Sequence, residues 1–306
     1  MKISVAMATY NGMSYIEEQL DSLRSQFQLP HEVVICDDAS TDGTADFIDE
    51  YIEKHFLFGW KLYRNTENVG FKRNFLSAIS KTDGDIIFLC DQDDIWYENK
   101  TEIMSRIMAE NPHILSLSSS FDFIDEAGEN LKIYEKKNTF NHGLICGKLN
   151  ENSLTQISLK TVMHSNISAG CTTVIRKELK NIFCQSSNSI LHHDWELNLV
   201  AASKDGLWFL DEKLIGYRIH SSNALGLNSA PEGRMQVAKE KLCAAETLCR
   251  YGDFKKLLNM QQTRLDALSN KNLFNVLKLF FTSFEYARYY SFKERIGDIA
   301  FVLRIK

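Results

Sequence analysis

Three carboxylates are crowded into Asp91-Gln92-Asp93-Asp94, directly after the apolar run Asp85–Cys90. Such crowding costs repulsion unless a cation neutralises it, and oxygen ligands of this kind suit Mg²⁺ or Mn²⁺, which bridge carboxylates to a substrate diphosphate. A solvated turn or a helix N-cap would use the same residue types, because aspartate is favoured at helix starts. The position of this acidic turn (residues 91–94) at a strand end favours the metal interpretation.

A second polar cluster, Asp37-Asp38-Ala39-Ser40-Thr41, follows the strand expected over Glu32–Cys36. A carboxylate there can accept a hydrogen bond from the N3–H of uracil or thymine, and Tyr10 can stack on that ring. A plain strand-to-helix connection explains the same residues, so the cluster alone leaves both interpretations open.

The elements that must position these clusters alternate along the chain. Strands are predicted at Ile3–Ala8, Glu32–Cys36, Trp60–Arg64, Asp85–Cys90 and Ile114–Phe121, and helices at Ser14–Gln26, Thr44–His55, Phe71–Ser80 and Glu98–Glu110. This alternation predicts an α/β fold with a mostly parallel sheet flanked by helices. Ligands of such sheets bind beyond the carboxyl ends of the strands, where Thr9-Tyr10-Asn11 and both acidic clusters are expected.

The second half of the chain is less regular. We expect a loop from about Asn138 to Lys160, a helix at Trp195–Ala202, and strands at Gly170–Arg176, Leu207–Asp211 and Leu214–Arg218. Helical patterns continue from about Asn223 to the end. The sequence therefore predicts an α/β domain over residues 1–222 and a helical C-terminal region over 223–306.

Composition narrows the class of protein. With 306 residues, 44% hydrophobic and 25% charged, the chain is that of an ordinary globular protein, and its net charge of −5 argues against a nucleic-acid coat. Seven cysteines without a CxxC pair are typical of reduced thiols in the cytoplasm. No apolar run reaches the ~18 residues of a membrane span, and no secretory signal is expected.

Six motifs together resemble a known family. MATYNG, VVICDDASTDGT, NVGFKRN, FLCDQDDIW, HHDWELNL and GYRIHSSN follow in this order over about residues 1–220. They resemble a family 2 glycosyltransferase of the GT-A (Rossmann-like) fold, and the DQDDIW and HDW forms are similar to bacterial polysaccharide rhamnosyltransferases. The resemblance implies an inverting transfer from a nucleotide sugar, with Mn²⁺ or Mg²⁺ on the diphosphate.

The resemblance also implies roles for residues on the donor side. The residues expected to bind the nucleotide are Thr9, Tyr10, Asn11, Asp38, Asn68, Lys72 and Asp91. Those expected to hold the metal are Asp91, Asp93 and His220, with Asp93 as the direct ligand. The family often has a longer segment ending in Ala-Arg-Asn where this chain has Lys72-Arg73-Asn74, so either Lys72 or Arg73 is placed at the diphosphate. A lone histidine is usually structural, which remains the other interpretation of His220.

Asp194 matches the aspartate that the family uses as the base, which removes the acceptor hydroxyl proton during attack. The residue before it is usually glutamate, whereas this chain has His193, whose role stays open between the acceptor side and simple packing. Trp195 is expected to form a wall of the acceptor pocket or part of the core. Arg218 is expected either to neutralise the departing diphosphate or to belong to a surface ion pair.

The last 36 residues differ in charge from the rest of the chain. Residues 271–306 hold seven Lys/Arg and three acids, so they carry +4 while the first 270 residues carry −9. Apolar residues between Leu273 and Phe284 precede Arg288, Lys293 and Arg295. A helix of this kind suits the membrane interface, and the alternative is packing on the catalytic domain or on a second copy in a homodimer.

The expected enzyme is therefore a cytoplasmic transferase. If the C-terminal helices bind the membrane, it would be a peripheral protein on the inner face of the cytoplasmic membrane. Its partners would be a donor (dTDP-L-rhamnose or a UDP-hexose) and a glycan or lipid-linked acceptor of surface polysaccharide synthesis. A nucleotidyltransferase is an alternative, but it would want a Gly-rich basic loop where this chain has Thr9-Tyr10-Asn11-Gly12-Met13. A catalytically inactive nucleotide-sugar-binding subunit is the second alternative.

Overall fold

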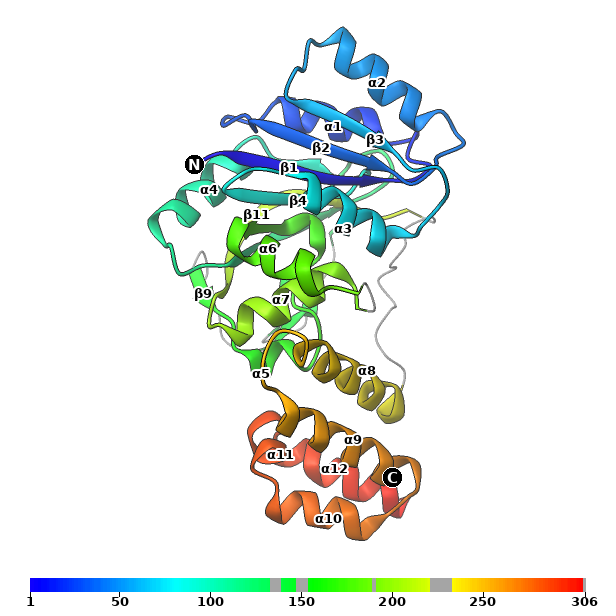
Figure 1. Cartoon of the computed structure of the whole chain (residues 1–306), viewed down its shortest axis with the longest axis vertical. Coiled ribbons are helices and arrows are strands. Elements are labelled where there is room, and N and C mark those ends of the chain that lie inside the picture. The colour runs from blue at the N-terminus through cyan, green and yellow to red at the C-terminus, as the bar shows by residue number, and fades with distance from the viewer. Residues whose placement is uncertain (133–138, 147–153, 189–190, 221–232, 305–306) are drawn as a thin grey trace. The chain divides into compact units, whose positions relative to one another are not determined.

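The computed structural model divides into two compact units, each described here by itself (Figure 1). The first unit comprises Met1–Ser158 and Ser165–Ala224, and the second comprises Leu159–His164 and Leu225–Lys306. The structure describes residues 1–132, 139–146, 154–188, 191–220 and 233–304. The domain boundary expected at residue 222 lies outside these described residues.

The first unit is built on one mixed sheet with the strand order β3-β2-β1-β4-β10-β6-β11-β5, and β9 pairs with β11. The strands are β1 (Ile3–Thr9), β2 (Glu32–Asp37), β3 (Trp60–Arg64), β4 (Ile86–Cys90), β5 (Ile95–Trp96), β6 (Ser116–Ile124), β9 (Leu154–Gln156), β10 (Thr173–Arg176) and β11 (Leu207–Arg218). A separate pair joins β7 (Thr139–Phe140) and β8 (Ile145–Cys146).

The strand directions put the polar clusters on one edge. Strands β3, β2, β1 and β4 are parallel, as are β6 and β11, whereas β10, β5 and β9 run antiparallel to their neighbours. The parallel register pairs Thr9 with Asp37 and Met7 with Cys90, so β1, β2 and β4 end together. The residues after these ends form the floor of the candidate site.

Helices cover both faces of the sheet, which explains why β2 and β4 are buried along their whole length. The helices of this unit are α1 (Ile16–Arg24), α2 (Thr44–Lys54), α3 (Phe71–Lys81), α4 (Lys100–Glu110), α6 (Lys177–Ser186) and α7 (His193–Ser203), with 3₁₀ turns η1 (Asn141–Gly143) and η2 (Gly170–Thr172). Helices α3, α6 and α7 pack together on one face, and α1 lies on the other (Figure 1).

In its described residues, the second unit is built of helices and the turns between them. It contains α5 (Leu159–Val162), α8 (Gly233–Leu248), α9 (Lys255–Ser269), α10 (Leu273–Thr282), α11 (Phe284–Tyr289) and α12 (Phe292–Leu303). Its small core includes Ala267, Leu268, Val276 and Val302. Within the described part of the chain, none of the helices combines the length and apolar character needed to cross a membrane.

Several elements differ from the sequence-based expectation. The two strands predicted within 207–218 form the single strand β11, whose register against β6 shifts twice. The strand predicted at Gly170–Arg176 begins with the turn η2, and α6 and β5 were not predicted at all. The loop expected over Asn138–Lys160 contains β7, β8 and β9, which are too short to show a periodic pattern.

Candidate active site

The paired aspartates after β2 organise the two loops beside them. Asp37 accepts hydrogen bonds from the hydroxyls of Thr9 (2.9 Å) and Ser40 (2.5 Å), so Thr9 is engaged inside the protein. The carboxylate of Asp38 accepts from the backbone N–H groups of Val69 and Gly70, both at 2.9 Å. Both carboxylates are buried; Asp37 ties Ser40 to the end of β1, and Asp38 holds the loop over residues 65–70.

The contacts that Asp38 makes with the loop limit the room for the nucleobase contact expected of it. Its carboxylate also accepts from the Asn65 amide at 2.8 Å, so three of about four acceptor positions are filled by the loop. The predicted contact between Asp38 and a nucleobase stays a prediction, and one acceptor position remains for it.

Tyr10 is held at the end of β1 with its ring outward. The side-chain amide of Gln92 accepts from the Tyr10 N–H at 2.7 Å and donates to the Tyr10 carbonyl at 3.0 Å. The ring is 47% exposed and available for stacking, whereas Asn11 has a left-handed backbone (φ 48°) and accepts from the Thr41 N–H. Gln92 thus couples the predicted base-binding residue to the acidic turn, a role that the sequence analysis did not assign.

Asn68 and Lys72 lie at the start of α3. The amide oxygen of Asn68 accepts from the Gly70 N–H at 3.0 Å. Lys72 is half-buried, and its ammonium lies 6.0 Å from the centre of the Phe71 ring, which in turn contacts the His192 ring at 5.3 Å. Burial and the charge of Lys72 lower the pKa of His192. Lys72 is therefore close to the beginning of α7, which carries the predicted base.

The acidic turn places Asp91 and Asp94 beside the thiol of Cys171. One potential ligand atom from each of these residues lies within 4.8 Å of the others. Burial raises the pKa of Asp94 to about 7, with the charge of Asp93 adding to the shift, and burial also raises the pKa of Asp91 well above its ordinary value. Oδ2 of Asp94 is buried and has no hydrogen-bond partner among the described residues. These carboxyl groups are poised to ionise fully only when a cation is near.

A lysine lies beside this cluster. Lys100 is completely buried, donates to the carbonyl of Cys171 at 2.5 Å, and places its ammonium 3.8 Å from the centre of the Trp96 ring. Burial lowers the pKa of Lys100 to about 8, and the charges of Asp94 and Asp91 oppose that shift. The sequence held one signal that was not used: Lys100 is the first residue of α4, where the helix dipole disfavours a cation.

Asp93 and His220 form the second pair of potential ligands. Nε2 of His220 lies 2.8 Å from Oδ2 of Asp93, and both side chains are mostly buried. His220 follows β11, so the pairing depends on β11 ending beside the acidic turn. Carboxylate oxygens suit Mn²⁺ and Mg²⁺, whereas an imidazole ligand suits a transition-metal ion such as Mn²⁺ better than Mg²⁺. The unpartnered Oδ2 of Asp94 lies in the same turn. The residues present therefore fit a divalent cation.

Arg218 is engaged inside the protein rather than at its surface. It is fully buried, and its guanidinium donates to the Glu18 carboxylate (2.5 Å) and to the carbonyls of Asp93 (2.7 Å) and Glu126 (2.8 Å). Its backbone N–H also donates to Asp94 at 3.0 Å. Arg218 does form an ion pair, with the half-exposed Glu18, but the arginine itself is buried and not at the surface. A contact with the diphosphate stays a prediction, and the visible role of Arg218 is to support the acidic turn.

The predicted base, Asp194, lies in the first turn of α7. Its carboxylate accepts from the Trp195 N–H at 2.7 Å, and burial raises its pKa to about 6, against the opposing hydrogen bonds from Asn166 and Gly170. A Cβ on Gly170 would lie 3.7 Å from the Cβ of Asp194, and the next residue, Cys171, contributes its thiol to the cluster with Asp91 and Asp94. The turn η2 therefore links the predicted base to the acidic turn.

His193 packs as a neutral ring behind Asp194. It is buried and stacked on Phe75 at 3.9 Å, and burial lowers its pKa to about 3. Neither ring nitrogen has a hydrogen-bond partner in the described part of the chain. A Cβ on Gly170 would lie 2.7 Å from Nε2 of His193, so this position needs glycine. Trp195 is half-buried, and nothing in its described surroundings separates the pocket wall from the core interpretation.

Comparisons with known proteins agree with this geometry. Over 239 residues, the chain is 28% identical to the dTDP-rhamnosyl transferase RfbG of Shigella flexneri, covering 72% of this chain and 74% of that protein. It is 38% identical over 106 residues to the abequosyltransferase RfbV of Salmonella typhimurium, covering 34% of this chain and 32% of RfbV.

Solved structures share the fold. S. aureus TarS (residues 1–349, in complex with UDP-GlcNAc) superposes with a TM-score of 0.57 at 19% identity, covering 100% of this chain and 83% of TarS. The mannosyltransferase PcManGT of Pyrobaculum calidifontis, in complex with GDP-Man and Mn²⁺, superposes with a TM-score of 0.55 at 17% identity, covering 99% of this chain and 85% of PcManGT. The family model "Glycosyl transferase family 2" matches residues 4–181. On this match, and with the GT-A fold, the chain belongs to glycosyl transferase family 2.

Proposed function

We propose that the protein is an inverting, metal-dependent glycosyltransferase that moves a sugar from a nucleotide sugar to a glycan or lipid-linked acceptor during surface polysaccharide synthesis. The observation that carries this proposal is the placement of Asp194, a buried carboxylate with a pKa raised to about 6, beside Gly170 of η2, whose neighbour Cys171 joins the cluster of Asp91 and Asp94. Family membership supports sugar transfer over the nucleotidyltransferase alternative.

The donor would lie along the edge formed by β1, β2 and β4. Tyr10 would stack on the base, Asp38 would accept from its N3–H, and Asp91 would contact the ribose or diphosphate. Asn11 and Asn68 shape the loops on either side, and Lys72 at the start of α3 would meet the diphosphate. A divalent cation, when bound, would be held by Asp93 and His220 and would neutralise charge on the leaving diphosphate.

The acceptor would approach from the side of α7. Asp194 takes the proton of the acceptor hydroxyl as that oxygen forms a bond to the anomeric carbon. The bond from that carbon to the diphosphate breaks on the opposite face, so the configuration inverts and the nucleoside diphosphate leaves with the electron pair. A pKa of about 6 leaves Asp194 ionised near neutral pH while keeping it basic enough to accept the proton.

The donor is assigned from the relatives. RfbG is described as a dTDP-rhamnosyl transferase, which supports dTDP-L-rhamnose, whereas TarS was solved with UDP-GlcNAc, which keeps a UDP-hexose as the second candidate. Uracil and thymine present the same edge to Asp38, so the residues that contact the base do not separate the two.

We place the reaction in the cytoplasm, since the six cysteines whose side chains the structure describes are free thiols. Peripheral association with the inner face of the membrane would bring the enzyme to a lipid-linked acceptor, and a homodimer is the competing use of the C-terminal helices.

A donor screen tests the proposal. The protein is incubated with Mn²⁺ and a panel of dTDP- and UDP-sugars, and nucleoside diphosphate release and thermal stabilisation are measured with and without chelator. We expect metal-dependent hydrolysis of one donor, with water in place of the acceptor, and NMR of the freshly released sugar should show an inverted anomeric configuration. Donor binding without any turnover would instead indicate the inactive subunit. Formation of a nucleoside triphosphate and a sugar phosphate when pyrophosphate is added would indicate a nucleotidyltransferase.

A further inference from the structure

The apolar segment of the C-terminal unit is divided between core and surface. Val276 and Leu279 of α10 are buried, whereas Phe274 and Phe281 of the same helix are 75% and 78% exposed. Two further phenylalanines are also exposed, Phe284 (75%) at the start of α11 and Phe292 (64%) at the start of α12. Exposed aromatic rings at this density in one small unit are typical of an interaction surface.

Ring contacts and helical spacing tie the rings at 274, 281 and 292 to one surface, and Phe284 directly follows the C-cap of α10. Phe280 contacts Phe281 at 5.1 Å and Phe292 at 5.7 Å between ring centres, which joins the end of α10 to the start of α12. Phe274 lies two helical turns before Phe281, on the same face of α10. We call the exposed rings at 274, 281, 284 and 292 the phenylalanine face.

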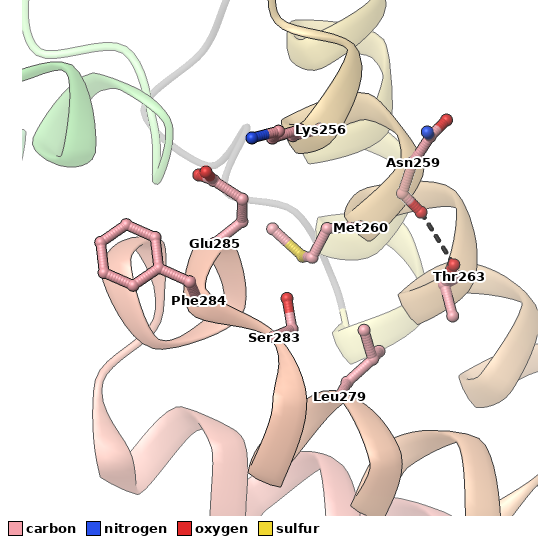
Figure 2. Close-up of a pocket in the computed structure, with 8 residues that line it drawn as sticks. All are labelled: Lys256, Asn259, Met260, Thr263, Leu279, Ser283, Phe284 and Glu285. Carbon is pink, nitrogen blue, oxygen red and sulfur yellow. Dashed lines mark hydrogen bonds between the residues drawn. The ribbon is translucent and has the colours of Figure 1, made fainter.

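A shallow groove of about 390 Å³ adjoins this face at Phe284 (Figure 2). Met260 of α9 and Leu279 of α10 line it, while Lys256 and Glu285 stand at its edge, as Figure 2 shows. The groove adjoins the face but is mixed in character, because polar residues also line it, namely Asn259, Thr263 and Ser283.

The charges around the phenylalanine face are basic. Lys271, Lys278, Arg288 and Lys293 are exposed. Two of the three acids of the same segment are engaged: buried Asp298 accepts from Arg264 at 2.7 Å, and Glu294 accepts from the Ser291 N–H at 2.8 Å. The third, Glu285, stands at the edge of the groove. The four exposed basic residues therefore outnumber the one acid beside the face.

We propose that the phenylalanine face and its basic rim bind an anionic lipid surface, with the rings in the interface and the lysines and arginine at the headgroups. Aromatic rings and cations in this arrangement suit the membrane interface. A symmetric dimer through the same face would bring the basic rim against its own copy, which like-charge repulsion opposes. The inference rests on the proposed function in one respect: membrane binding would bring the enzyme to a lipid-linked acceptor.

Vesicle binding tests this assignment in the full-length protein. The first variant carries Phe→Ser at 274, 281, 284 and 292, and the second carries Lys/Arg→Gln at 271, 278, 288 and 293. The matched control is Phe56→Ser with Phe58→Ser, since these rings of the first unit are also 75% and 91% exposed. Each protein is sedimented with vesicles of phosphatidylcholine, with and without phosphatidylglycerol.

We expect wild type and control to bind only the vesicles that contain phosphatidylglycerol, and both test variants to bind at least about tenfold more weakly. Wild-type binding should also fall with salt, because exposed charges are screened within about 10 Å at 0.1 M. Circular dichroism checks folding. If the serine variant unfolds, the glutamine variant, which changes only exposed side chains, decides the test.

Three results would overturn the inference. They are wild-type binding that does not depend on phosphatidylglycerol, unchanged binding by the two folded variants, and a wild-type dimer by light scattering that the serine variant converts to monomer. Transfer to a short soluble acceptor is measured in parallel without vesicles. Absence of transfer by the wild-type protein would contradict the proposed function. Normal transfer by a wild-type protein that does not bind vesicles would contradict only the membrane role of the phenylalanine face.

Discussion

Nε2 of His220 lies 2.8 Å from Oδ2 of Asp93, although 127 positions separate the two residues in the sequence. The pair forms because β11 ends beside the acidic turn, where the N–H and guanidinium of Arg218 hold Asp94 and the Asp93 carbonyl. Two groups of potential ligands thus lie in one place, namely Asp93 with His220, and Asp91 with Asp94 and Cys171.

Metal binding should depend on the first group. Asp93→Asn and His220→Gln should each lower the Mn²⁺ affinity at least about tenfold, because an amide is a poor substitute for a carboxylate or imidazole ligand. The Mn²⁺-dependent rise in thermal stability should then need correspondingly more metal. Thermal unfolding across a Mn²⁺ titration measures this. Glu110→Gln, at an exposed site, is the control. A loss of Mn²⁺ affinity in Cys171→Ser, but not in Asp93→Asn or His220→Gln, would place the metal at Asp91, Asp94 and Cys171 instead.

Lys100 should act as a built-in counter-charge to Asp91 and Asp94. Lys100→Met removes the donor to the Cys171 carbonyl and should lower stability without metal. Because it also removes positive charge beside the carboxylates, the stabilisation by Mn²⁺ should be larger than in wild type. A purely structural lysine would lower stability and leave the Mn²⁺ increment unchanged. Lys204→Met, at an exposed lysine, controls for the loss of one surface charge.

Arg218 should matter for stability far more than an exposed arginine. Arg218→Lys loses the planar guanidinium that reaches Glu18 and two carbonyls, and we expect a cost of about 3–5 kcal/mol, as for disrupting a buried charged network. Arg64→Lys is the matched control, because Arg64 pairs with Asp46 and Asp49 at the surface, where such pairs are worth about 0–1 kcal/mol. Urea unfolding of both variants measures the difference, and equal losses would contradict the buried role.

The raised pKa of Asp194 predicts opposite pH effects on activity and stability. Activity should rise as pH increases through about 6, where the carboxyl group becomes the ionised base. The group ionises at lower pH in the unfolded chain than in the folded one, so its burial cost appears as pH rises above the unfolded value and is complete above about 6. Asp194→Asn should therefore stabilise the fold by up to about 3 kcal/mol at pH 8 and by much less at pH 4. An equal difference at both pH values would contradict the shift.

The sequence predicted the sheet edge well because that edge depends on local patterns. Apolar runs followed by Tyr10, Asp38 and the acidic turn predicted strands and their ends, and Trp60–Arg64 is a strand with the predicted bounds. Parallel strands that end together bring such residues into one place whatever the details of packing.

The supporting contacts could not be predicted, because their partners are distant in sequence. Lys100 meets Cys171, Gln92 holds Tyr10, and Arg218 reaches Glu18, and in each case the spacing is 71 residues or more. Burial decided the rest. Arg218, for which one expected role was half of a surface ion pair, is itself fully buried. The tail's apolar residues divide between core and surface according to which side of α10 they occupy.

The central claim is that Asp194 is the base of sugar transfer, and the most direct measurement is the transfer rate of Asp194→Asn at saturating donor, alongside its nucleotide affinity by calorimetry. The account predicts a fall in kcat of ~10²–10⁴, with nucleotide and Mn²⁺ affinities close to wild type, because the amide keeps the hydrogen bond from the Trp195 N–H but cannot take a proton. Transfer at the wild-type rate by a folded Asp194→Asn protein would contradict it.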